Sequence, residues 1–464
     1  PVVEPSLAAK YDLESYSGVS VSNPEKTIRL SISPFDFQSM TVANGTYEFI
    51  DPVRSENSVY RVHEKTEKSH TGKPFVCSTT ENPTSVKQLD NLLQSAGTTL
   101  RPSDKKFRTL RIAMSVTGEY TRYFGGVPQA LAQVNATLTR VNGVFEKELA
   151  LHLNLVDKPE LIYADPKTDP YSDSSAGTLG AWNMELQRTL TTVVGESNYD
   201  IGHLFGADGG GGNAGCIGCV CVSPKLDANG VPVSQQKGSG YTSPADGKPF
   251  GDNFDIDYVA HELGHQLGAN HTFSHKTEAT TAQVEPGSGS TIMGYAGITN
   301  ANVQLHSDAY FAYTSFSQIQ SVLQSAKCDV ETAVANNPPS ITAFKTYNIP
   351  KGTPFVLDAQ VTDPEGDPMT YTWEQNNPAS VAITKIVSTN TSGPNFRSLP
   401  PGSSTMRYFP KLSSVLLGKL VNTEEWEAVS DVARNFSFVF TAWLTIWCKR
   451  PSFQPVLAFS MLPH

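Results

Sequence analysis

The feature that most constrains this chain is a short run with three regularly placed histidines, His261-Glu262-Leu263-Gly264-His265-Gln266-Leu267-Gly268-Ala269-Asn270-His271. Residues four apart lie on one face of a helix, so His261 and His265 can offer their imidazoles to one ion. Glu262 lies one step round the helix, where it can reach a water on that ion without ligating the ion itself. The run therefore predicts a metal-binding helix that also carries a general base.

The end of the same run predicts how the helix stops and how a third ligand returns. Gly268 lets the chain leave the helix through a backbone conformation that is costly for other residues, and His271 can then face the ion. Three nitrogen ligands leave zinc an open position for water, which is typical of a catalytic site. By average residue usage, the full pattern arises by chance in about one chain of this length in a hundred thousand. A surface helix with solvated histidines is the alternative.

The bulk composition narrows the class of protein. The chain has 464 residues, of which 39% are hydrophobic and 17% are charged, so it should fold and should form more than one domain. A net charge of −10 argues against a nucleic-acid partner, which would need a basic face. There is no stretch of about 20 apolar residues, so we expect no membrane span.

Six cysteines are spread unevenly over the chain: Cys77, Cys216, Cys219, Cys221, Cys328 and Cys448. Three of them lie together in Gly-Cys-Ile-Gly-Cys-Val-Cys. A metal knuckle would need a fourth ligand, and the next cysteine is distant in the sequence, so disulfides are favoured over a knuckle or a set of buried thiols. Disulfides imply an oxidising compartment, and we therefore expect a secreted protein that works outside the cell or at its surface.

Strand and helix periodicities divide the chain into three predicted domains. Residues 1–104 carry short alternating runs, which predict a small β-rich domain. Residues 105–335 alternate between strand and helix patterns, which predicts an α/β layer. The predicted strands of this layer are 109–117, 150–156 and 199–205, and its predicted helices are 127–147, 181–194, 257–266 and 315–327.

Residues 336–464 form the third predicted domain. Strand patterns flank a turn at 363–367 that is rich in Asp, Glu, Gly and Pro, as in a β-sandwich. The acidic turn is a candidate Ca2+ site, although a solvated turn is the simpler interpretation. From about residue 441 the composition changes, because two of the five tryptophans and Cys448 fall there. A truncated or altered end of this domain is therefore expected.

The run at 261–271 resembles the zinc site of the metzincin clan of zinc endopeptidases. Metzincins place a methionine-containing turn beneath the metal, and Gly287-Ser-Gly-Ser-Thr-Ile-Met293-Gly294-Tyr295 is similar to that turn. The resemblance implies that Met293 forms the apolar floor of the site. It also implies a role for Tyr295, which in some metzincins weakly ligates zinc and then stabilises the oxyanion; simple packing is the alternative.

Within the clan, the stretch from about 109 to 328 resembles the reprolysin (adamalysin) family, in a bacterial-looking version. The order of strand, long helix, strand, helix, edge strand, zinc helix, methionine turn and C-terminal helix agrees. The resemblance implies a catalytic domain built on a twisted mixed sheet, with substrate extended along an edge strand near 203–206. Thr272 departs from the Asp that reprolysins usually have, and His271-Thr272-Phe273 is instead similar to pappalysin-type metzincins.

The resemblance also gives roles to the cysteines. In reprolysins a disulfide ties the C-terminal helix to the region after the edge strand, which implies a bond from Cys328 to one of Cys216, Cys219 and Cys221, with the other two paired. Latent metzincins carry a propeptide cysteine that takes the open position on zinc and blocks catalysis. Lys73-Pro-Phe-Val-Cys77 is similar to such a switch, which implies that residues 1–104 are a propeptide; an ordinary buried cysteine is the alternative. Lys105-Lys106 is then either the activation site or a charged turn.

We therefore predict a secreted, monomeric zinc metalloendopeptidase that acts on protein or peptide substrates. Zinc would activate a water, and Glu262 would take its proton and deliver it to the leaving amine. The first alternative is a cell-surface adhesion or carbohydrate-binding protein with a vestigial metal site, because the third domain resembles cadherin-type and polycystic-kidney-disease (PKD) modules. The second alternative is a non-peptidase zinc hydrolase, against which Met293 and His271 speak.

Overall fold

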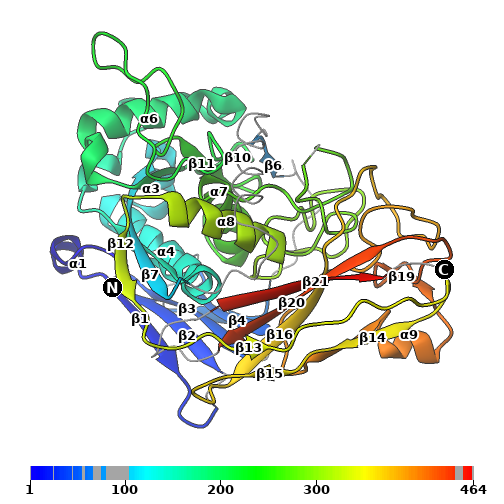
Figure 1. Cartoon of the computed structure of the whole chain (residues 1–464). Helices are drawn as coiled ribbons and strands as arrows, with labels where there is room; N and C mark the ends of the chain where they lie inside the picture. The colour runs from blue at the N-terminus through cyan, green and yellow to red at the C-terminus, as the bar shows by residue number, and fades with distance from the viewer. Residues whose placement is uncertain are drawn as a thin grey trace. The chain divides into compact units, whose positions relative to one another are not determined.

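A computed structural model describes residues 2–23, 26–43, 45–54, 58–65, 75–79, 104–278, 280–444 and 453–461, the last stretch by its backbone alone (Figure 1). The chain forms two compact units. The first unit is Pro1–Ser85, Phe107–Gly268 and Val322–Thr332, and the second unit is Val86–Lys106, Ala269–Ser321 and Ala333–His464. The predicted boundaries near residues 104 and 335 stay predictions. None of the described helices has the length and apolar character that crossing a bilayer requires.

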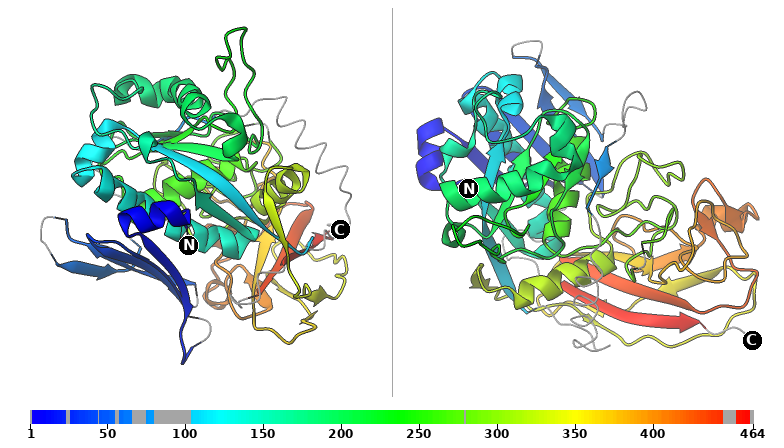
Figure 2. Two further views of the ribbon diagram at one scale, coloured as in Figure 1. Left: turned by 90° about the vertical axis from the view of Figure 1, so that its left-hand side faces the viewer. Right: turned by 90° about the horizontal axis from the view of Figure 1, so that it is seen from above.

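The first unit begins with helix α1 (Pro5–Tyr11) and an antiparallel five-stranded sheet in the order β1 to β5, which we call the N-terminal sheet. Its strands are β1 Glu14–Val19, β2 Thr27–Ile32, β3 Phe37–Ala43, β4 Thr46–Pro52 and β5 Tyr60–His63. The sheet packs on the long helix α4 (Val127–Leu149), where a Cβ at Gly143 would come within 2.8 Å of the Arg29 and Met40 side chains (Figure 2). Glycine at this position lets the helix and the sheet approach closely.

A seven-stranded mixed sheet follows in the order β12-β7-β9-β11-β10-β6, with β8 beside β7. Its strands are β6 Val76–Cys77, β7 Lys106–Val116, β8 Leu151–Leu155, β9 Ile201–Phe205, β10 Gly211–Asn213, β11 Gly240–Ser243 and β12 Val330–Ala333. The pairs of β7 with β8 and β9, and of β9 with β11, are parallel, whereas β10 is antiparallel to β11. The predicted mixed α/β sheet is confirmed.

The predicted position of the edge strand, near 203–206, is wrong. Strand β9, which contains His203, lies between β7 and β11, and every residue of the strand is buried. A strand that is buried in this way has no free edge to offer a substrate. The chain instead adds β10 outside β11 as an antiparallel pair, and β6 then pairs with the outer edge of β10.

The helices of the layer lie where the periodicity predicts them. Besides α4 they are α3 Gly118–Phe124, α5 Ser174–Ala176, α6 Trp182–Val193, α7 Ala260–Gln266 and α8 Tyr313–Ser325, with the π-helical turns η2 Gly177–Ala181 and η4 Asn253–Val259 and the 3-10 turns η1 Pro159–Leu161 and η3 Glu196–Asn198. Helix α6 packs through Trp182, Leu186 and Leu190, which form a buried cluster with Leu204 of β9 and Tyr241 of β11. These apolar positions recur at helical spacing, which is why the segment is helical and faces the sheet.

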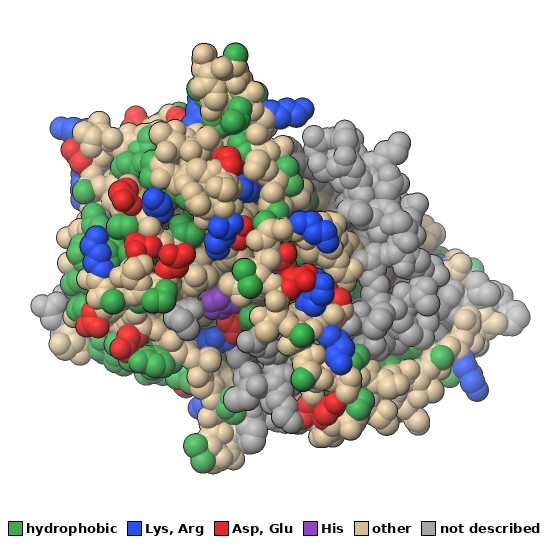
Figure 3. All heavy atoms as spheres, turned by 60° about the vertical axis from the view of Figure 1, so that its left-hand side comes forward, with side chains coloured by type: hydrophobic (Ala, Val, Ile, Leu, Met, Phe, Trp, Pro, Cys, Tyr) green, Lys and Arg blue, Asp and Glu red, His purple; other side chains and the backbone are tan. Residues whose placement is uncertain are grey.

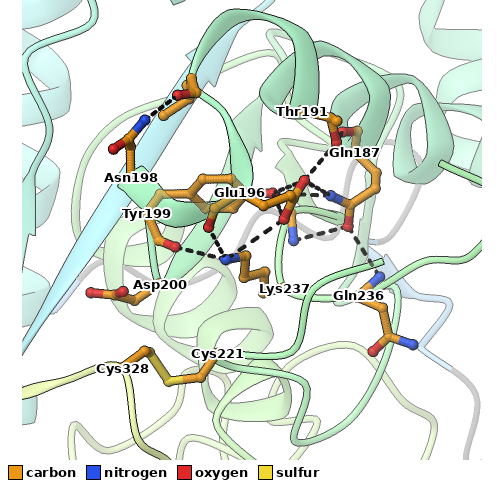
Figure 4. Close-up of polar contacts among 12 residues, drawn as sticks. Gln187, Thr191, Glu196, Asn198, Tyr199, Asp200, Cys221, Gln236, Lys237 and Cys328 are labelled. Atoms are coloured by element: carbon orange, nitrogen blue, oxygen red, sulfur yellow. Dashed lines mark hydrogen bonds and ion pairs between the residues drawn. A yellow bond between two sulfur atoms is a disulfide. The ribbon is translucent and has the colours of Figure 1, made fainter. Parts of the chain in front are cut away.

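Two disulfides lie in the first unit, Cys216–Cys219 and Cys221–Cys328. The second one ties the chain after α8 to the loop after β10, which is one of the pairings left open by the sequence. Beside it, the Lys237 ammonium donates to the Tyr199 carbonyl oxygen at 2.9 Å and lies over the Tyr199 ring (Figure 4). The Glu196 carboxylate lies 3.6 Å from the same ammonium. These contacts tie the end of the loop between β10 and β11 to the segment that precedes β9.

The second unit is rich in short strands, as predicted for the C-terminal region. They are β13 Ser340–Ile341, β14 Phe355–Asp358, β15 Val361–Thr362, β16 Met369–Gln375, β17 Met406–Phe409, β18 Val421–Asn422, β19 Glu427–Ala428, β20 Phe436–Leu444 and β21 Phe453–Met461, with the helix α9 Leu412–Leu416. Trp373, Phe396, Phe409, Phe438 and Phe440 are part of its apolar core. The resemblance to cadherin or PKD modules and the altered end stay predictions, and Cys448 lies outside the described residues.

The acidic turn of the second unit uses its carboxylates to shape the turn. Asp363 Oδ1 accepts the backbone amides of Glu365 at 3.0 Å and of Asp367 at 2.9 Å. Asp367 Oδ2 accepts from the Asn336 side-chain amide at 2.8 Å. Asp side chains that bind backbone amides two residues on are typical of turns. Calcium at this turn stays a prediction.

Candidate metal centre

Two histidines of helix α7 bring their Nε2 atoms to the same place. The Nε2 atoms of His261 and His265 are 3.1 Å apart, and the ring planes are 87° apart. Both side chains are buried. The helix ends just before Gly268, whose φ of 121° lies in the region that other residues rarely adopt. The local geometry therefore follows from the four-residue spacing and from the glycine.

Cys77 of β6 brings a thiol to these histidines. Its Sγ atom is 3.7 Å from His265 Nε2. One potential ligand atom from each of Cys77, His261, His265 and His271 lies within 4.8 Å of the other three, and all four residues are buried. Among the described residues, this is the one group of three or more His, Cys, Asp or Glu side chains whose ligand atoms lie close enough together to hold a metal ion.

The donor set and its spacing fit zinc. In a tetrahedral site with Zn–N of about 2.05 Å and Zn–S of about 2.3 Å, two nitrogens lie about 3.4 Å apart and a nitrogen and a sulfur about 3.6 Å apart. The corresponding separations here are 3.1 Å between the His261 and His265 nitrogens and 3.7 Å from Cys77 Sγ to the His265 nitrogen. Imidazole and thiolate ligands suit zinc, whereas Mg2+ and Ca2+ prefer oxygen.

His271 is held by neighbours of its own. Its Nδ1 lies 2.8 Å from Glu278 Oε2, which fixes the ring and favours ligation of a metal through Nε2. The Tyr295 ring packs edge-on against the imidazole, with 4.7 Å between ring centroids. Met293 is fully buried, and its carbonyl oxygen accepts the Thr272 amide at 3.1 Å. The methionine turn thus adjoins the third histidine.

A buried glutamate explains why threonine, rather than aspartate, suits position 272. Glu285 Oε2 accepts the hydroxyls of Thr272 and Thr291, each at 2.6 Å, and Glu285 Oε1 accepts the Ser290 amide at 2.9 Å. A carboxylate at position 272 would face the Glu285 carboxylate without a proton to share, which is unfavourable in a buried site. Threonine instead donates to it and links the residue after the third histidine to the methionine turn.

Glu262 is fully buried and is contacted from β6. The Thr79 hydroxyl donates to Glu262 Oε2 at 2.9 Å and accepts the Ala214 amide at 2.8 Å. A Cβ at Gly212 would lie 2.2 Å from Glu262 Oε1, so glycine in β10 leaves the space for the carboxylate. Burial raises the pKa of Glu262 to about 8. Burial also raises the pKa of the Cys77 thiol, and the Glu262 charge adds to that effect.

Residues 75–79, which we call the β6 segment, extend the sheet along β10. Cys77 pairs with Gly212 in parallel orientation. The Ser78 amide donates to the Gly212 carbonyl oxygen at 2.8 Å, and the Asn213 side-chain amide donates to the Ser78 carbonyl oxygen at 3.0 Å. Adding a strand to a sheet edge is a general way of binding an extended peptide. The β6 segment therefore lies along the outer edge of β10 in the manner of an added strand.

Helix α7 is fixed to the sheet and to the shorter disulfide loop. The Gln266 side-chain amide donates to the Gly202 carbonyl oxygen at 3.0 Å, and Gln266 Oε1 lies 2.8 Å from His203 Nδ1. Burial lowers the pKa of His203 to about 4, so the ring is neutral at physiological pH. The Gly218 amide donates to the His265 carbonyl oxygen at 2.9 Å, which satisfies a carbonyl at the helix C-terminus. These contacts hold two of the candidate ligands in place.

Sequence reasoning missed three neighbours of the candidate ligands: Thr79, Glu278 and Tyr258. Thr79 follows Cys77 by two residues, so an extended segment places both side chains on one face. This spacing could have indicated Thr79 from the sequence. Tyr258 lies in the π-helical turn η4, three residues before the first histidine, and its contact with Phe75 joins segments far apart in the sequence. Glu278 follows His271 by seven residues in a loop, where spacing carries no information about contact.

The comparison with protein families agrees with this geometry. Residues 106–327 match the family model described as Metallo-peptidase family M12B Reprolysin-like. The matched region contains the three histidines and Glu262, whereas Cys77 precedes it. No curated protein matched the chain.

Proposed function

On the premise that residues 106–327 are a reprolysin-like metallopeptidase domain and that the chain is a zinc metalloendopeptidase, we propose that His261, His265 and His271 bind the zinc and that Glu262 is the general base. The observation that carries this proposal is the convergence of three imidazoles and one thiol, whose potential ligand atoms all lie within 4.8 Å of one another. A vestigial metal site would have no reason to keep this spacing together with a buried carboxylate beside it.

Each protein group has a defined task in the proposed reaction. Zinc, when bound, supplies Lewis-acid activation of a water and of the scissile carbonyl. Glu262 accepts the proton of the attacking water and delivers it to the leaving amine. Its Oε1 atom has no hydrogen-bond partner among the described residues, so this oxygen is available for the proton. Tyr295 donates its hydroxyl to the oxyanion, and Met293 forms the apolar floor.

The enzyme is latent in this form, because the β6 segment fills the site. When zinc is bound, Cys77 would be its fourth ligand and would exclude water from the metal. The hydroxyl of Thr79 donates to Glu262 at 2.9 Å and occupies the carboxylate oxygen that it contacts. The segment therefore blocks the metal and the base together. Residues 1–104 act as the propeptide of a secreted protein, and the disulfides support an oxidising compartment.

Activation requires a cut between the β6 segment and β7. At the Lys105-Lys106 pair, the Lys105 carbonyl oxygen accepts the Val334 amide at 2.7 Å, and Lys106 is the first residue of β7. A protease binds an extended, accessible backbone, so these two contacts disfavour a cut at the pair itself. The preceding residues 80–103 lie outside the described residues.

Protein substrates would bind as extended chains along β10 once the β6 segment has left. Backbone pairing does not depend on the substrate's side chains, which suits an endopeptidase. On the face that Figure 3 shows, acidic and basic side chains are interspersed over the described surface rather than gathered by sign. Charge on this face therefore gives no preference for a strongly acidic or basic partner.

A protease assay tests the proposal. After treatment with trypsin that is then fully inhibited, the chain should cleave casein or gelatin, a zinc chelator should abolish cleavage, and zinc should restore it. Glu262→Ala should keep its zinc and lose activity by about a thousandfold or more, since a general base and its positioning of water are both removed. Chelator-resistant cleavage, or full activity of Glu262→Ala, would contradict the role assignments. No cleavage together with carbohydrate or cell binding would favour the adhesion alternative.

A further inference from the structure

An aromatic pair joins the β6 segment to the metal-binding helix. The rings of Phe75 and Tyr258 are stacked with 3.9 Å between centroids and 5° between planes. Phe75 is 3% exposed, so its side chain is almost completely enclosed. By contrast, its neighbour Val76 is 54% exposed. Alternate side chains of a strand point to opposite faces, so Phe75 and Cys77 share the inward face and Val76 lies on the outward face.

The position of Tyr258 relates this pair to the metal centre. Tyr258 lies in η4, the π-helical turn that runs directly into α7, three residues before His261. Phe75 lies two residues from Cys77, which is one step of the strand on the same face. Phe75 and Cys77 are therefore successive inward-facing side chains of the β6 segment, one stacked on Tyr258 and the other among the histidines.

We propose that Tyr258 forms the floor of a subsite beside the metal that selects an aromatic side chain of the substrate. This inference rests on the proposed function, because it requires that substrates occupy the β10 edge after the β6 segment has left. Departure of Phe75 uncovers the face of the Tyr258 ring. An incoming peptide that pairs with β10 presents its own alternate side chains toward the helix, and a flat ring restores the stacking that Phe75 gave.

The charges around Tyr258 indicate which side chain would compete with an aromatic ring for the proposed subsite. Burial raises the pKa of Tyr258, and the negative charges of Asp257 and Asp246 add to the effect, so the phenol is neutral at physiological pH. A neutral ring stacks well with a second aromatic ring. The same carboxylates would also attract a guanidinium, which stacks on tyrosine as a cation. Arginine is therefore the side chain that the experiment must compare with phenylalanine.

The first arm uses the full-length chain and needs no activity. The measurement is the alkylation rate of Cys77, followed by mass mapping of the labelled peptide. Loss of the stack in Phe75→Leu or Tyr258→Leu should raise the rate about three- to tenfold, whereas Tyr258→Phe should leave it unchanged. The double variant Phe75→Leu, Tyr258→Leu should not exceed the single variants by more than about twofold, because the two residues act on one contact.

The second arm tests the substrate. Wild type that has been cut with trypsin and freed of it should cleave peptides with Phe at the position that takes the place of Phe75 about three- to tenfold faster than matched peptides with Leu or Arg there, measured as kcat/KM. Tyr258→Phe should keep this ratio, and Tyr258→Leu should reduce it to about one while still cleaving. Equal ratios in wild type and Tyr258→Leu, or a preference for Arg, overturn the inference and leave the proposed function intact. No cleavage by wild type overturns both.

Discussion

The β6 segment and the N-terminal sheet contact the rest of the first unit in different ways. The β6 segment binds by backbone pairing to β10, one stacked ring and the contacts of Cys77 and Thr79. The N-terminal sheet binds through a buried ion network, in which Arg140 of α4 lies 2.6 Å from Asp51 of β4 and 3.0 Å from Asp255 of η4. The contacts of the β6 segment with the candidate metal centre are therefore separate from the contacts that hold the N-terminal sheet, and the two sets can be tested separately.

The largest effect should follow from breaking the anchor. Arg140→Ala leaves Asp51 and Asp255 buried without their cation, and we expect the free energy of unfolding to fall by about 3–5 kcal/mol in urea titrations. The matched control is Arg122→Ala, because Arg122 makes an exposed 3.9 Å pair with Asp165. That variant should lie within about 0.5 kcal/mol of wild type. A loss below about 1 kcal/mol for Arg140→Ala would show that the ion network does not anchor the sheet.

The next effect should distinguish the contact of Cys77 with the candidate metal centre from the ion network that holds the N-terminal sheet. Cys77→Ser removes the sulfur ligand but keeps the backbone pairing to Gly212. We expect the proteolytic activity of the uncut chain to rise about tenfold or more, which corresponds to about 1.4 kcal/mol of lost blocking. The urea midpoint should stay close to wild type, because the anchor is untouched. An uncut Cys77→Ser chain as silent as wild type, alongside an active trypsin-treated sample, would contradict a cysteine switch.

A smaller effect should appear at the contact between Thr79 and the carboxylate. Thr79→Val removes the hydroxyl that donates to Glu262 and accepts from the Ala214 amide, whereas Thr79→Ser keeps it. Loss of these hydrogen bonds should weaken binding of the β6 segment by about 1–2 kcal/mol. Cys77 alkylation in the uncut chain should then be about five- to thirtyfold faster in Thr79→Val than in Thr79→Ser. Equal rates for the two variants would mean that the hydroxyl does not hold the segment.

The smallest effect concerns the pH dependence of the anchor. His63 of β5 lies 2.9 Å from Asp51, and the hydrogen bond that its ring donates to the Asp51 carboxylate raises the pKa of His63, with further contributions from the Glu64 carbonyl oxygen and the charges of Asp51 and Asp252. A raised pKa in the folded state means that the stabilisation is complete below the unfolded value of about 6.5 and is lost as pH rises through the folded value.

Replacing His63 by glutamine, which does not titrate, isolates the effect of His63 protonation on stability. The free energy of unfolding of His63→Gln should be lower than that of wild type by about 1 kcal/mol near pH 6. The difference should shrink toward zero above the folded pKa of His63. A difference that grows with pH would contradict the assigned ion pair.

The regular part of the fold and the metal site were predictable because their signals are local. Helix periodicity gave α4, α6 and α8, and the four-residue spacing placed His261 beside His265. The edge strand was placed wrongly, because β10 has three residues, two of them glycines, and has no strand pattern of its own. The partners of Arg140 were not predictable either, since Asp51 and Asp255 lie 89 and 115 residues away in the sequence. Pairing over such distances depends on tertiary packing.

X-ray absorption at the zinc edge of the uncut chain tests the central claim most directly. We expect one zinc per chain, with three nitrogen neighbours at about 2.0–2.1 Å and one sulfur neighbour at about 2.3 Å. Trypsin treatment should remove the sulfur signal and replace it with an oxygen neighbour. A chain that binds no zinc, or an uncut chain whose zinc has only nitrogen and oxygen neighbours, would contradict the claim that Cys77 completes a zinc site built by His261, His265 and His271.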